Sequence, residues 1–393
     1  MSAPLLPPST LRPFALERYF ARYEFDAPYL LSPSDCEPLT LAGLLARATP
    51  AQRARWETLS LGYTHSAGAP ELREAIVALD ERLPSAPRTP PLSAPHSAEE
   101  LIVLAPEEGI YLAMEALLSP GDEVIVTWPG YQSLYEIARA KGCALKRWVA
   151  EEAPGRGWCF KFEQLEALLS DKTKLLVVNT PHNPTGAHFT VEEQAQLAAL
   201  AERRGFRIFS DEIYRGLERP GVDRLPVMST LSDRVISLGG LSKAFNLPGL
   251  RIGWVSTRDR ALLGRIQDLR DYTTICSSAP SEALALIALS LGASLFRENC
   301  ARIERHIEAL DALCVRMSER LSWSPPRAGS VGLLKWGGEA PASEVAERLV
   351  SEAGVMVLPS TIFEFGDRHL RVGLGRENFL EALERFAAHL GAL

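Results

Sequence analysis

Residues 238–253 read Leu-Gly-Gly-Leu-Ser-Lys-Ala-Phe-Asn-Leu-Pro-Gly-Leu-Arg-Ile-Gly and place Lys243 in a loop of glycine and serine. The lysine follows the apolar run 234–238 and stands eight residues before Arg251. Of the seven lysines in the chain, only Lys243 lies in a strand-end loop with so little charge around it. Because a lysine amine reacts only when its pKa is lowered by desolvation or nearby positive charge, this loop indicates a lysine with a chemical role.

The stretch belongs to a series of short apolar runs that alternate with helical patterns. The apolar runs are 101–105, 123–127, 174–179, 206–210, 234–238 and 252–256. The helical patterns between them include 109–118, 131–141 and 191–203. This alternation predicts an α/β lobe with a mostly parallel sheet flanked by helices. Ligands in such lobes bind at the carboxyl ends of the strands.

After about residue 280 the pattern changes to a long helical stretch followed by short strands. The strands are predicted at 331–336, 355–358 and 369–374, and a closing helix at 376–391. This pattern predicts a second, smaller α+β lobe. We therefore expect three parts: an N-terminal arm that contributes to the small domain (1–45), a large domain (46–285) and a small C-terminal domain (286–393).

Composition excludes several classes of protein. A chain of 393 residues exceeds the size at which one core stops growing, about 250–300 residues, which favours two lobes. Hydrophobic residues at 46% and charged residues at 23% are typical of a globular protein. A net charge of -7 without a long basic run argues against a nucleic-acid or membrane partner.

Cysteine use and the N-terminus point to a cytoplasmic protein without a metal site. The six cysteines form no C-x-x-C pair and no Cys/His cluster with zinc-ligand spacing. The first residues lack the pattern of a secretory signal, and no apolar run reaches the roughly 18 residues that a membrane helix needs.

Two further stretches carry unusual residues directly after a predicted strand. Asn179-Thr-Pro-His-Asn-Pro-Thr-Gly186 follows the run 174–179, and by itself could be a simple turn. Phe209-Ser-Asp-Glu-Ile-Tyr214 places two acids at the end of a strand, and by itself could be a helix cap with a surface glutamate. Because all three stretches occur in one chain in this order and at these intervals, a simple turn and a simple helix cap explain them less well together than separately.

Together the three stretches resemble the class I/II aminotransferases of fold type I, the aspartate-aminotransferase-like pyridoxal-phosphate enzymes, over nearly the whole chain. The resemblance implies pyridoxal 5'-phosphate as cofactor, and transfer of an amino group between an amino acid and a 2-oxo acid. Elimination, replacement, cyclisation or oxidative deamination on the same fold remain alternatives. A regulatory module fused to a DNA-binding domain is less consistent, because residues 1–40 show no helix-turn-helix pattern or basic stripe.

The resemblance also implies roles for particular residues. Lys243 would form the Schiff base with the cofactor and later move the α-proton of the substrate. Asp211 would pair with the pyridinium nitrogen and keep it protonated, while Tyr214 and Asn183 would hydrogen-bond the phenolic oxygen of the cofactor. Trp128 would stack on the cofactor ring, with Tyr131 as the alternative.

Three more residues match positions that bind phosphate or substrate. Arg251 would hold the cofactor phosphate together with a helix N-terminus. Tyr63 would reach the phosphate of a neighbouring subunit, so that the working unit is a homodimer with shared active sites. Arg371 would bind the substrate α-carboxylate with its planar fork, and Asn183 would contribute to the same substrate site.

The sequence departs from the family pattern at the phosphate cradle. The turn Ala105-Pro106-Glu107 replaces the usual glycine and small polar residue, and Pro106 lacks an N–H. We expect the amides of Glu107 and Glu108 to bind phosphate while their side chains point away. Gly240 stands where a phosphate-binding serine is usual, and Ser242, Ser237 or a water could replace that hydroxyl.

The segment 31–37 stands where the family's N-terminal segment meets the substrate, and it carries Asp35 and Glu37. One interpretation of this charge is a basic substrate side chain. The alternative is an exposed polar turn.

Overall fold

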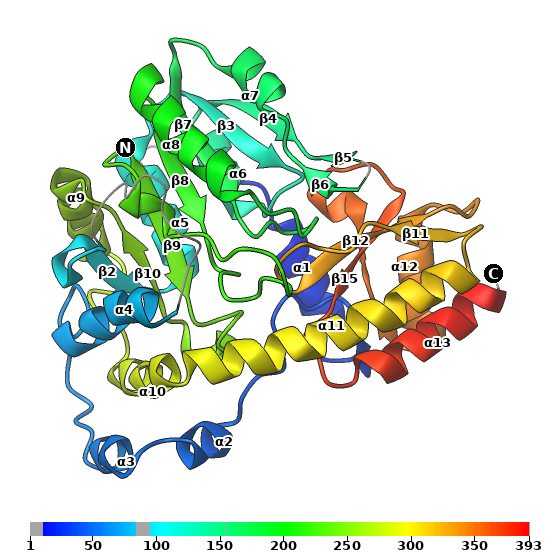
Figure 1. Cartoon of the computed structure of the whole chain (residues 1–393), viewed down its shortest axis with the longest axis horizontal. Helices are drawn as coiled ribbons and strands as arrows, with labels where there is room; N and C mark the ends of the chain where they lie inside the picture. The colour runs from blue at the N-terminus through cyan, green and yellow to red at the C-terminus, as the bar shows by residue number, and fades with distance from the viewer. Residues whose placement is uncertain (1–10, 84–94, 154, 393) are drawn as a thin grey trace, which may run out of the picture.

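The structure is a computed structural model that describes residues 11–83, 95–153 and 155–392. The first ten residues of the expected N-terminal arm lie outside this range. The chain forms a large lobe, a small lobe and a long helix, α11 (Gly292–Arg316), that runs along both (Figure 1).

The large lobe is built on a seven-stranded sheet in the order β2-β10-β9-β8-β7-β3-β4. Only β10 is antiparallel to its neighbours, β2 and β9. This confirms the predicted α/β lobe with a mostly parallel sheet. The strands are β2 (Leu101–Leu104), β3 (Glu123–Trp128), β4 (Ala144–Val149), β7 (Thr173–Asn179), β8 (Arg207–Asp211), β9 (Val235–Gly240) and β10 (Gly253–Ser256).

Helices cover both faces of this sheet because its strands are apolar on both sides. Side chains alternate along β3: Val124 and Val126 join the core under one set of helices, while Ile125 joins the core on the opposite face. The first set is α5 (Pro106–Leu117), α6 (Ser133–Ala140) and α9 (Arg260–Arg270); the second is α7 (Phe162–Leu168) and α8 (Val191–Arg204).

The small lobe is built on a four-stranded antiparallel sheet in the order β11-β12-β15-β14. Its strands are β11 (Leu321–Trp323), β12 (Val331–Trp336), β14 (Leu358–Pro359) and β15 (His369–Gly373). Helices α12 (Ala342–Ala353) and α13 (Phe379–Ala392) pack beside it. The N-terminal part contributes β1 (Tyr29–Leu30), which pairs with β13 (Val355–Met356).

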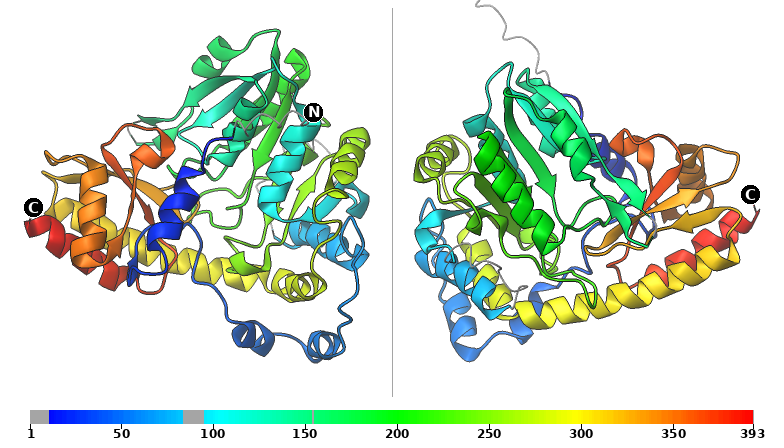
Figure 2. Two further views of the ribbon diagram at one scale, coloured as in Figure 1. Left: turned by 180° about the vertical axis from the view of Figure 1, so that it is seen from behind. Right: turned by 45° about the horizontal axis from the view of Figure 1, so that its top comes forward.

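The N-terminal helix α1 (Ala15–Tyr23) lies at the junction between the two lobes (Figure 2). Its buried residue Leu16 packs with Leu358 and Phe363 of the small lobe. The hydroxyl of Tyr19 donates to the carbonyl of Val357 at 2.9 Å. These contacts fix one face of α1 on the small lobe and leave another face for the junction.

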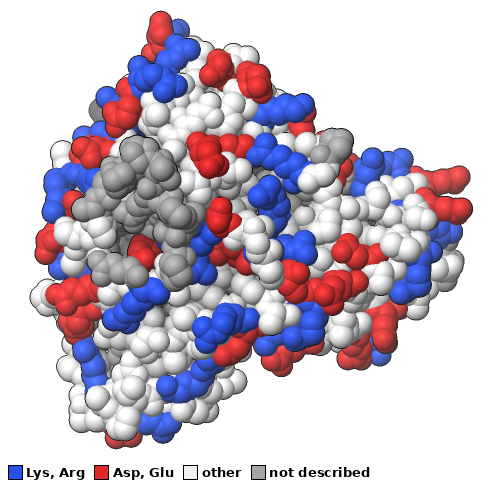
Figure 3. Space-filling model, in the orientation of Figure 1, with Lys and Arg blue, Asp and Glu red and all other residues white. Residues whose placement is uncertain are grey.

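The remaining helices flank the large lobe. They are α2 (Leu41–Ala46), α3 (Pro50–Glu57), α4 (Pro70–Arg82) and α10 (Ala279–Ser290). Among the described residues, no single helix is long and apolar enough to cross a membrane; α10 and α11, bent by 74° at their junction, meet such a criterion only as a pair. On the face shown in Figure 3, acidic and basic side chains are interspersed.

Two of the large-lobe elements at which the structure differs from the sequence expectations are β4 and α5. Strand β4 was not predicted, because Lys146 and Arg147 interrupt its apolar pattern at the edge of the sheet. Helix α5 begins at Pro106 and not at residue 109. Proline is favoured in the first helical turn because no intrahelical partner is lost there.

A close contact at Gly186, in the loop after β7, gives a test of the packing between lobes. Gly186 has a φ of +70°, and a Cβ there would lie 2.6 Å from the Cα of Pro326 and closer still to its Cβ. Gly186→Ala should therefore combine a left-handed backbone cost of about 1–2 kcal/mol with an overpacking cost of about 1–3 kcal/mol. Thermal unfolding should show a clear fall in Tm.

The matched control is Gly205→Ala at the end of α8. Gly205 has a φ of +80°, and a Cβ added there would meet nothing within 4 Å. This variant should show only the backbone cost, and hence a smaller fall in Tm. Equal falls in Tm for the two variants would contradict the contact between Gly186 and Pro326.

Candidate active site

The three unusual stretches meet at the carboxyl ends of β7, β8 and β9. Asn179 and Asp211 are register partners at the ends of β7 and β8. The side chain of Asn179 donates from Nδ2 to the carbonyl of Asp211 at 3.0 Å, and its Oδ1 accepts from the amide of Asn183 at 2.7 Å. One buried amide thus connects two of the stretches, and the loop after β9 brings in Lys243.

Lys243 reaches a point between the large lobe and the N-terminal segment. Its Nζ donates to the Oγ of Ser34 at 2.8 Å and lies 5.7 Å from the centre of the Tyr214 ring. Ser34 was not predicted as a site residue, because a serine in a polar turn has no distinctive pattern. The amine is half-buried and faces the same space as Asp211 and Tyr214.

Asp211 is a buried carboxyl at the end of β8. Its Oδ1 accepts the amide N–H of Ile213 at 3.1 Å. Burial raises the pKa of Asp211 from 3.8 to about 7, and the nearby carboxyls of Glu107 and Glu212 act in the same direction. Within the described residues, Asp211 has no ion-pair partner within 4 Å. A buried acid of this kind suits a cationic ligand atom.

Arg371 on β15 is the corresponding buried cation. Its Nη1 donates to Oδ1 of Asn183 at 3.1 Å and its Nη2 to the carbonyl of Ser32 at 2.7 Å. Its Nε is buried and has no hydrogen-bond partner among the described residues. Burial lowers the pKa of Arg371. The guanidinium is thus fixed in place and retains an unused donor for an anionic ligand.

The structure corrects the assignment of Trp128 as the stacking aromatic. Its ring packs under the guanidinium of Arg147, 3.8 Å from the ring centre, and 4.9 Å from the ring of Tyr135. Trp128 belongs to the same core as Val124 and Val126, because period-two alternation along β3 places all three on one face. The side chain therefore faces helix α6 and not the strand ends.

Tyr131 takes the position expected for the aromatic residue. It follows the end of β3, and its ring lies near Asp211, Tyr214 and Glu107, which together with burial hold its pKa well above the ordinary value. It also contacts Phe14 at 5.0 Å between ring centres. Tyr131 was the alternative candidate from the sequence.

The structure also corrects the expectation that both acids of α5 point away. The Oε1 of Glu108 accepts from the hydroxyl of Thr274 at 2.8 Å and from that of Thr273, so this side chain does face away. The Glu107 carboxyl instead lies near Ser133, Tyr131 and Arg251, and burial raises its pKa. Glu107 is the second residue of α5, so its carboxyl lies near the carboxyl ends of the strands.

A side chain at position 240 would require its neighbours to shift. A Cβ on Gly240 would lie 2.7 Å from Cδ1 of Ile213. Ser237 cannot replace the hydroxyl of the family's serine, because it donates to Oε1 of Glu212 at 2.6 Å and accepts the amide of Ser229 at 2.9 Å. Ser242, buried directly before Lys243, remains the candidate.

Arg251 and Tyr63 lie at the edge of the site. Arg251 is exposed, with a φ of 54°, and its Nη1 donates to the carbonyl of Pro248 at 3.0 Å. Its charge partly opposes the rise that burial causes in the pKa of Glu107, which places Arg251 on the α5 side. Tyr63 is 91% exposed and does not reach the site of its own chain.

The acids of segment 31–37 do not present free negative charge. Arg376 binds Asp35 at 3.1 Å and lies 3.9 Å from Glu37. The Glu37 carboxyl also accepts the amide of Glu377 at 3.0 Å. The sequence-based interpretation that Asp35 and Glu37 attract a basic substrate is therefore not supported by their surroundings.

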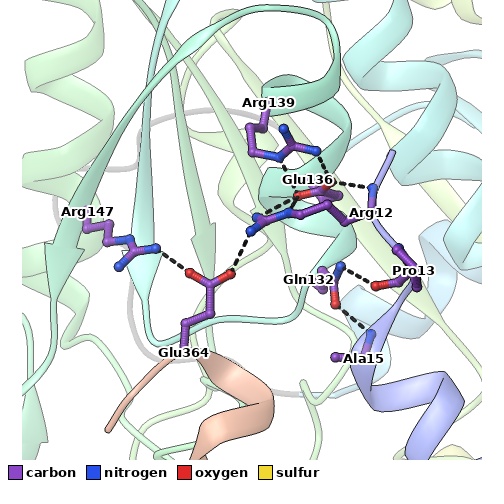
Figure 4. A network of polar contacts seen from close by, with 8 residues as sticks. All are labelled: Arg12, Pro13, Ala15, Gln132, Glu136, Arg139, Arg147 and Glu364. Carbon is purple, nitrogen blue, oxygen red and sulfur yellow. Dashed lines mark hydrogen bonds and ion pairs between the residues drawn. The ribbon is translucent and has the colours of Figure 1, made fainter. Parts of the chain in front are cut away.

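A polar network that the sequence did not predict anchors the N-terminal helix (Figure 4). The guanidinium of Arg12 binds Oε2 of Glu136 at 2.8 Å, and Arg139 binds the same carboxylate. These charges hold the pKa of Glu136 at about 2. Glu364 of the small lobe binds Arg12 at 3.2 Å and Arg147 at 2.5 Å.

Gln132 completes the anchor of α1 to the large lobe (Figure 4). Its Oε1 accepts the amide of Ala15 at 2.8 Å, and its Nε2 donates to the carbonyl of Pro13 at 3.0 Å. Because Gln132 follows Tyr131 directly, α1 is fixed next to the strand ends. Pairs separated by more than a hundred residues leave no local sequence signal, which is why this network was missed.

Comparison with known proteins identifies the family. Residues 44–386 match the model of the aminotransferase class I and II family, and the chain belongs to this family. It is 31% identical over 269 residues to capreomycidine synthase of Streptomyces vinaceus, covering 68% of this chain and 67% of that protein. It is 32% identical over 337 residues to the aspartate/prephenate aminotransferase of Thermus thermophilus, covering 84% and 83%.

Solved structures agree with this assignment. A PLP-dependent aminotransferase from Streptococcus suis has a TM-score of 0.86 and 27% identity, covering 97% of both chains. The PLP-dependent cyclase OrfR has a TM-score of 0.85 and 25% identity, covering 99% of this chain and 100% of that one. The chain is therefore a fold type I enzyme of the aminotransferase class, with pyridoxal phosphate as its cofactor.

The residues present fit this cofactor. The buried Asp211, which forms no ion pair within 4 Å among the described residues, matches a protonated ring nitrogen. Tyr131 offers an aromatic face, and the loop from Ser242 to Arg251 with the N-terminus of α5 offers donors for a phosphate. Lys243 lies within the same group of side chains.

The raised pKa of Asp211 predicts a pH-dependent stability of the cofactor-free protein. Between the unfolded pKa of 3.8 and the folded pKa of about 7, the unfolded chain releases a proton that the folded chain retains. Stability contributed by this group therefore falls as pH rises through that window. Asp211→Asn should raise Tm at about pH 8, and the gain should shrink as pH falls towards about 4.

The control for this variant is Asp171→Asn, which removes an exposed carboxyl in the loop after α7. It should leave the pH dependence of Tm unchanged. A Tm of the Asp211 variant that falls below that of the parent at every pH would show that the ionised carboxyl is not penalised by burial.

The assignment of Tyr131, and not Trp128, as the aromatic residue next to the cofactor gives a second test. Tyr131→Leu should weaken binding of pyridoxal phosphate about 2- to 12-fold, since ring stacking contributes about 0.5–1.5 kcal/mol. Trp128→Leu should lower Tm through lost core packing but leave the cofactor affinity unchanged. Equilibrium titration of the two cofactor-free variants measures both affinities. A loss of cofactor affinity in Trp128→Leu but not in Tyr131→Leu would show that Trp128 is the stacking residue.

Proposed function

We propose that this enzyme is an aminotransferase that moves an amino group from an amino acid to a 2-oxo acid. The observation that carries the proposal is the buried Arg371, held by Asn183 and the carbonyl of Ser32 with its Nε unused. Two residues further along the same segment, the hydroxyl of Ser34 accepts from the amine of Lys243. A buried guanidinium can bind the α-carboxylate of an amino acid, and a lysine amine can act at its α-amino end.

The bound cofactor would supply an electron sink for the negative charge that forms at the substrate α-carbon. The residues of the chain supply the rest. Arg371 and Asn183 bind and orient the α-carboxylate. Lys243 removes the α-proton and returns it at a different atom, and Asp211 keeps the ring nitrogen protonated. Tyr214 and Asn183 hydrogen-bond the phenolic oxygen.

We also propose that two copies of the chain complete each other's sites. Tyr63, Leu61 and Tyr272 are 91%, 81% and 92% exposed, which is unusual for large apolar side chains. They lie on neighbouring segments, because the hydroxyl of Thr64 donates to the carbonyl of Ser277 at 2.9 Å. A second subunit covering this surface would bring its Tyr63 to the phosphate side.

A second candidate is another reaction of the same carbanion, such as cyclisation. It is favoured by the similarity to capreomycidine synthase and to the cyclase OrfR, and by the altered phosphate side at Glu107 and Gly240. The binding residues proposed above serve both reactions. Aminotransfer and cyclisation differ in whether the amino group leaves the substrate.

A single-turnover experiment distinguishes the two. Holoenzyme mixed with amino acids one at a time should lose its visible cofactor absorbance with a substrate, and a 2-oxo acid should restore it. The nitrogen of a ¹⁵N-labelled amino acid should appear in the new amino acid. Lys243→Ala should lose turnover by several orders of magnitude, since proton transfer alone contributes about 10²–10⁴-fold. Product that retains the label, without restoration by a 2-oxo acid, would favour cyclisation or replacement, and label released as ammonia would favour elimination.

A further inference from the structure

Two carboxylates of α1 face the candidate active site. Glu17 and Glu24 are seven residues apart, a separation that places them on the same side of a helix. The Oε1 of Glu17 lies 3.5 Å from the Tyr131 hydroxyl, and its charge acts on Arg371. Burial and the charge of Asp35 raise the pKa of Glu24, the C-cap residue of α1, while the charges of Arg376 and Lys243 act in the opposite direction. Glu17 therefore lies beside Tyr131, and Glu24 lies within reach of the charges of Asp35, Arg376 and Lys243.

The position of these acids is fixed by both lobes. The large lobe holds the start of α1 through Arg12, Glu136 and Gln132 (Figure 4). The small lobe holds it through Leu16 and Tyr19. An anchor on each side prevents α1 from turning its acidic face away from the site, so the two carboxylates belong to the site's lining.

These carboxylates form no direct ion pair in the described part of the chain, although the charge of Arg376 acts on Glu24. Within the described residues, neither Glu17 nor Glu24 has an ion-pair partner within 4 Å, whereas Asp35 is bound by Arg376. Arg371 is already positioned for the α-carboxylate by Asn183 and Ser32. Unpaired negative charge at a partly enclosed site favours a positively charged ligand group.

We propose that the substrate of this enzyme carries a cationic side chain, an amine or a guanidinium, which Glu17 and Glu24 bind. The buried Arg371, with its unpaired Nε, fixes the α-carboxylate and Lys243 the α-amine end. The side chain of the substrate then extends to α1 and not towards another cation. This inference rests on the proposed amino-acid substrate, but not on which reaction follows.

The test compares pairs of amino acids in which one member has a cationic side chain and the other a neutral side chain of similar shape. Holoenzyme is titrated with L-arginine and with its neutral analogue L-citrulline, and with L-lysine and L-norleucine, while the visible absorbance of the cofactor is followed. We expect the apparent Kd to be lower for the cationic member of each pair. Glu17→Gln and Glu24→Gln should each reduce the arginine-to-citrulline preference about 3- to 10-fold, the range for a partly exposed ionic hydrogen bond.

Asp171→Asn provides the control, because it removes one exposed charge outside α1 and should leave the preference unchanged. Glu17→Arg should reverse the order and favour L-glutamate over L-lysine. Equal or tighter binding of citrulline and norleucine, or a preference that the Glu17 and Glu24 variants do not alter, would overturn the inference. Absence of any spectral response to all amino acids would instead overturn the proposed function, so the two failures are distinguishable.

Discussion

The site depends on one buried amide, the side chain of Asn179. It is bonded to the backbone of Asp211 on one side and to the backbone of Asn183 on the other. Asn183 in turn holds Arg371, which comes from the small lobe. Because a buried amide that loses a partner costs about 1–3 kcal/mol, this chain of bonds fixes the end of β8, the loop after β7 and the contact between lobes in one arrangement.

Much of the fold and part of the site could be predicted from the sequence. The apolar runs located six strands of the main sheet, since buried parallel strands are continuously apolar. Lys243, Asp211 and Asn183 lie together because the ends of β7, β8 and β9 meet at one edge, and Arg371 reaches Asn183 from the small lobe. Trp128 was assigned wrongly because the motif alone does not show which face of β3 the residue occupies. The direction of Glu107 depends on packing around Tyr131, which has no local signal.

The charged residues around the site fall into two groups: residues that pair with one another and hold the fold together, and residues that we propose bind the substrate. Arg12, Glu136, Arg139, Glu364 and Arg147 bind one another and join the arm to both lobes (Figure 4). Asp35 and Arg376 similarly compensate each other. Glu17 and Glu24 have no such ion-pair partners among the described residues; Glu17 lies beside Tyr131, and the charge of Lys243 acts on Glu24. Sequence composition could not distinguish the two groups. The net charge of -7 does not show which acids are paired and which are not.

The most direct test of the account is to locate the cofactor on the chain. Purified holoenzyme is reduced with borohydride, digested, and the peptides that carry the cofactor are mapped by mass spectrometry. The account predicts that the label is on Lys243 and on none of the other six lysines. A label on another lysine, or an unlabelled Lys243 in protein that retains the cofactor, would contradict it.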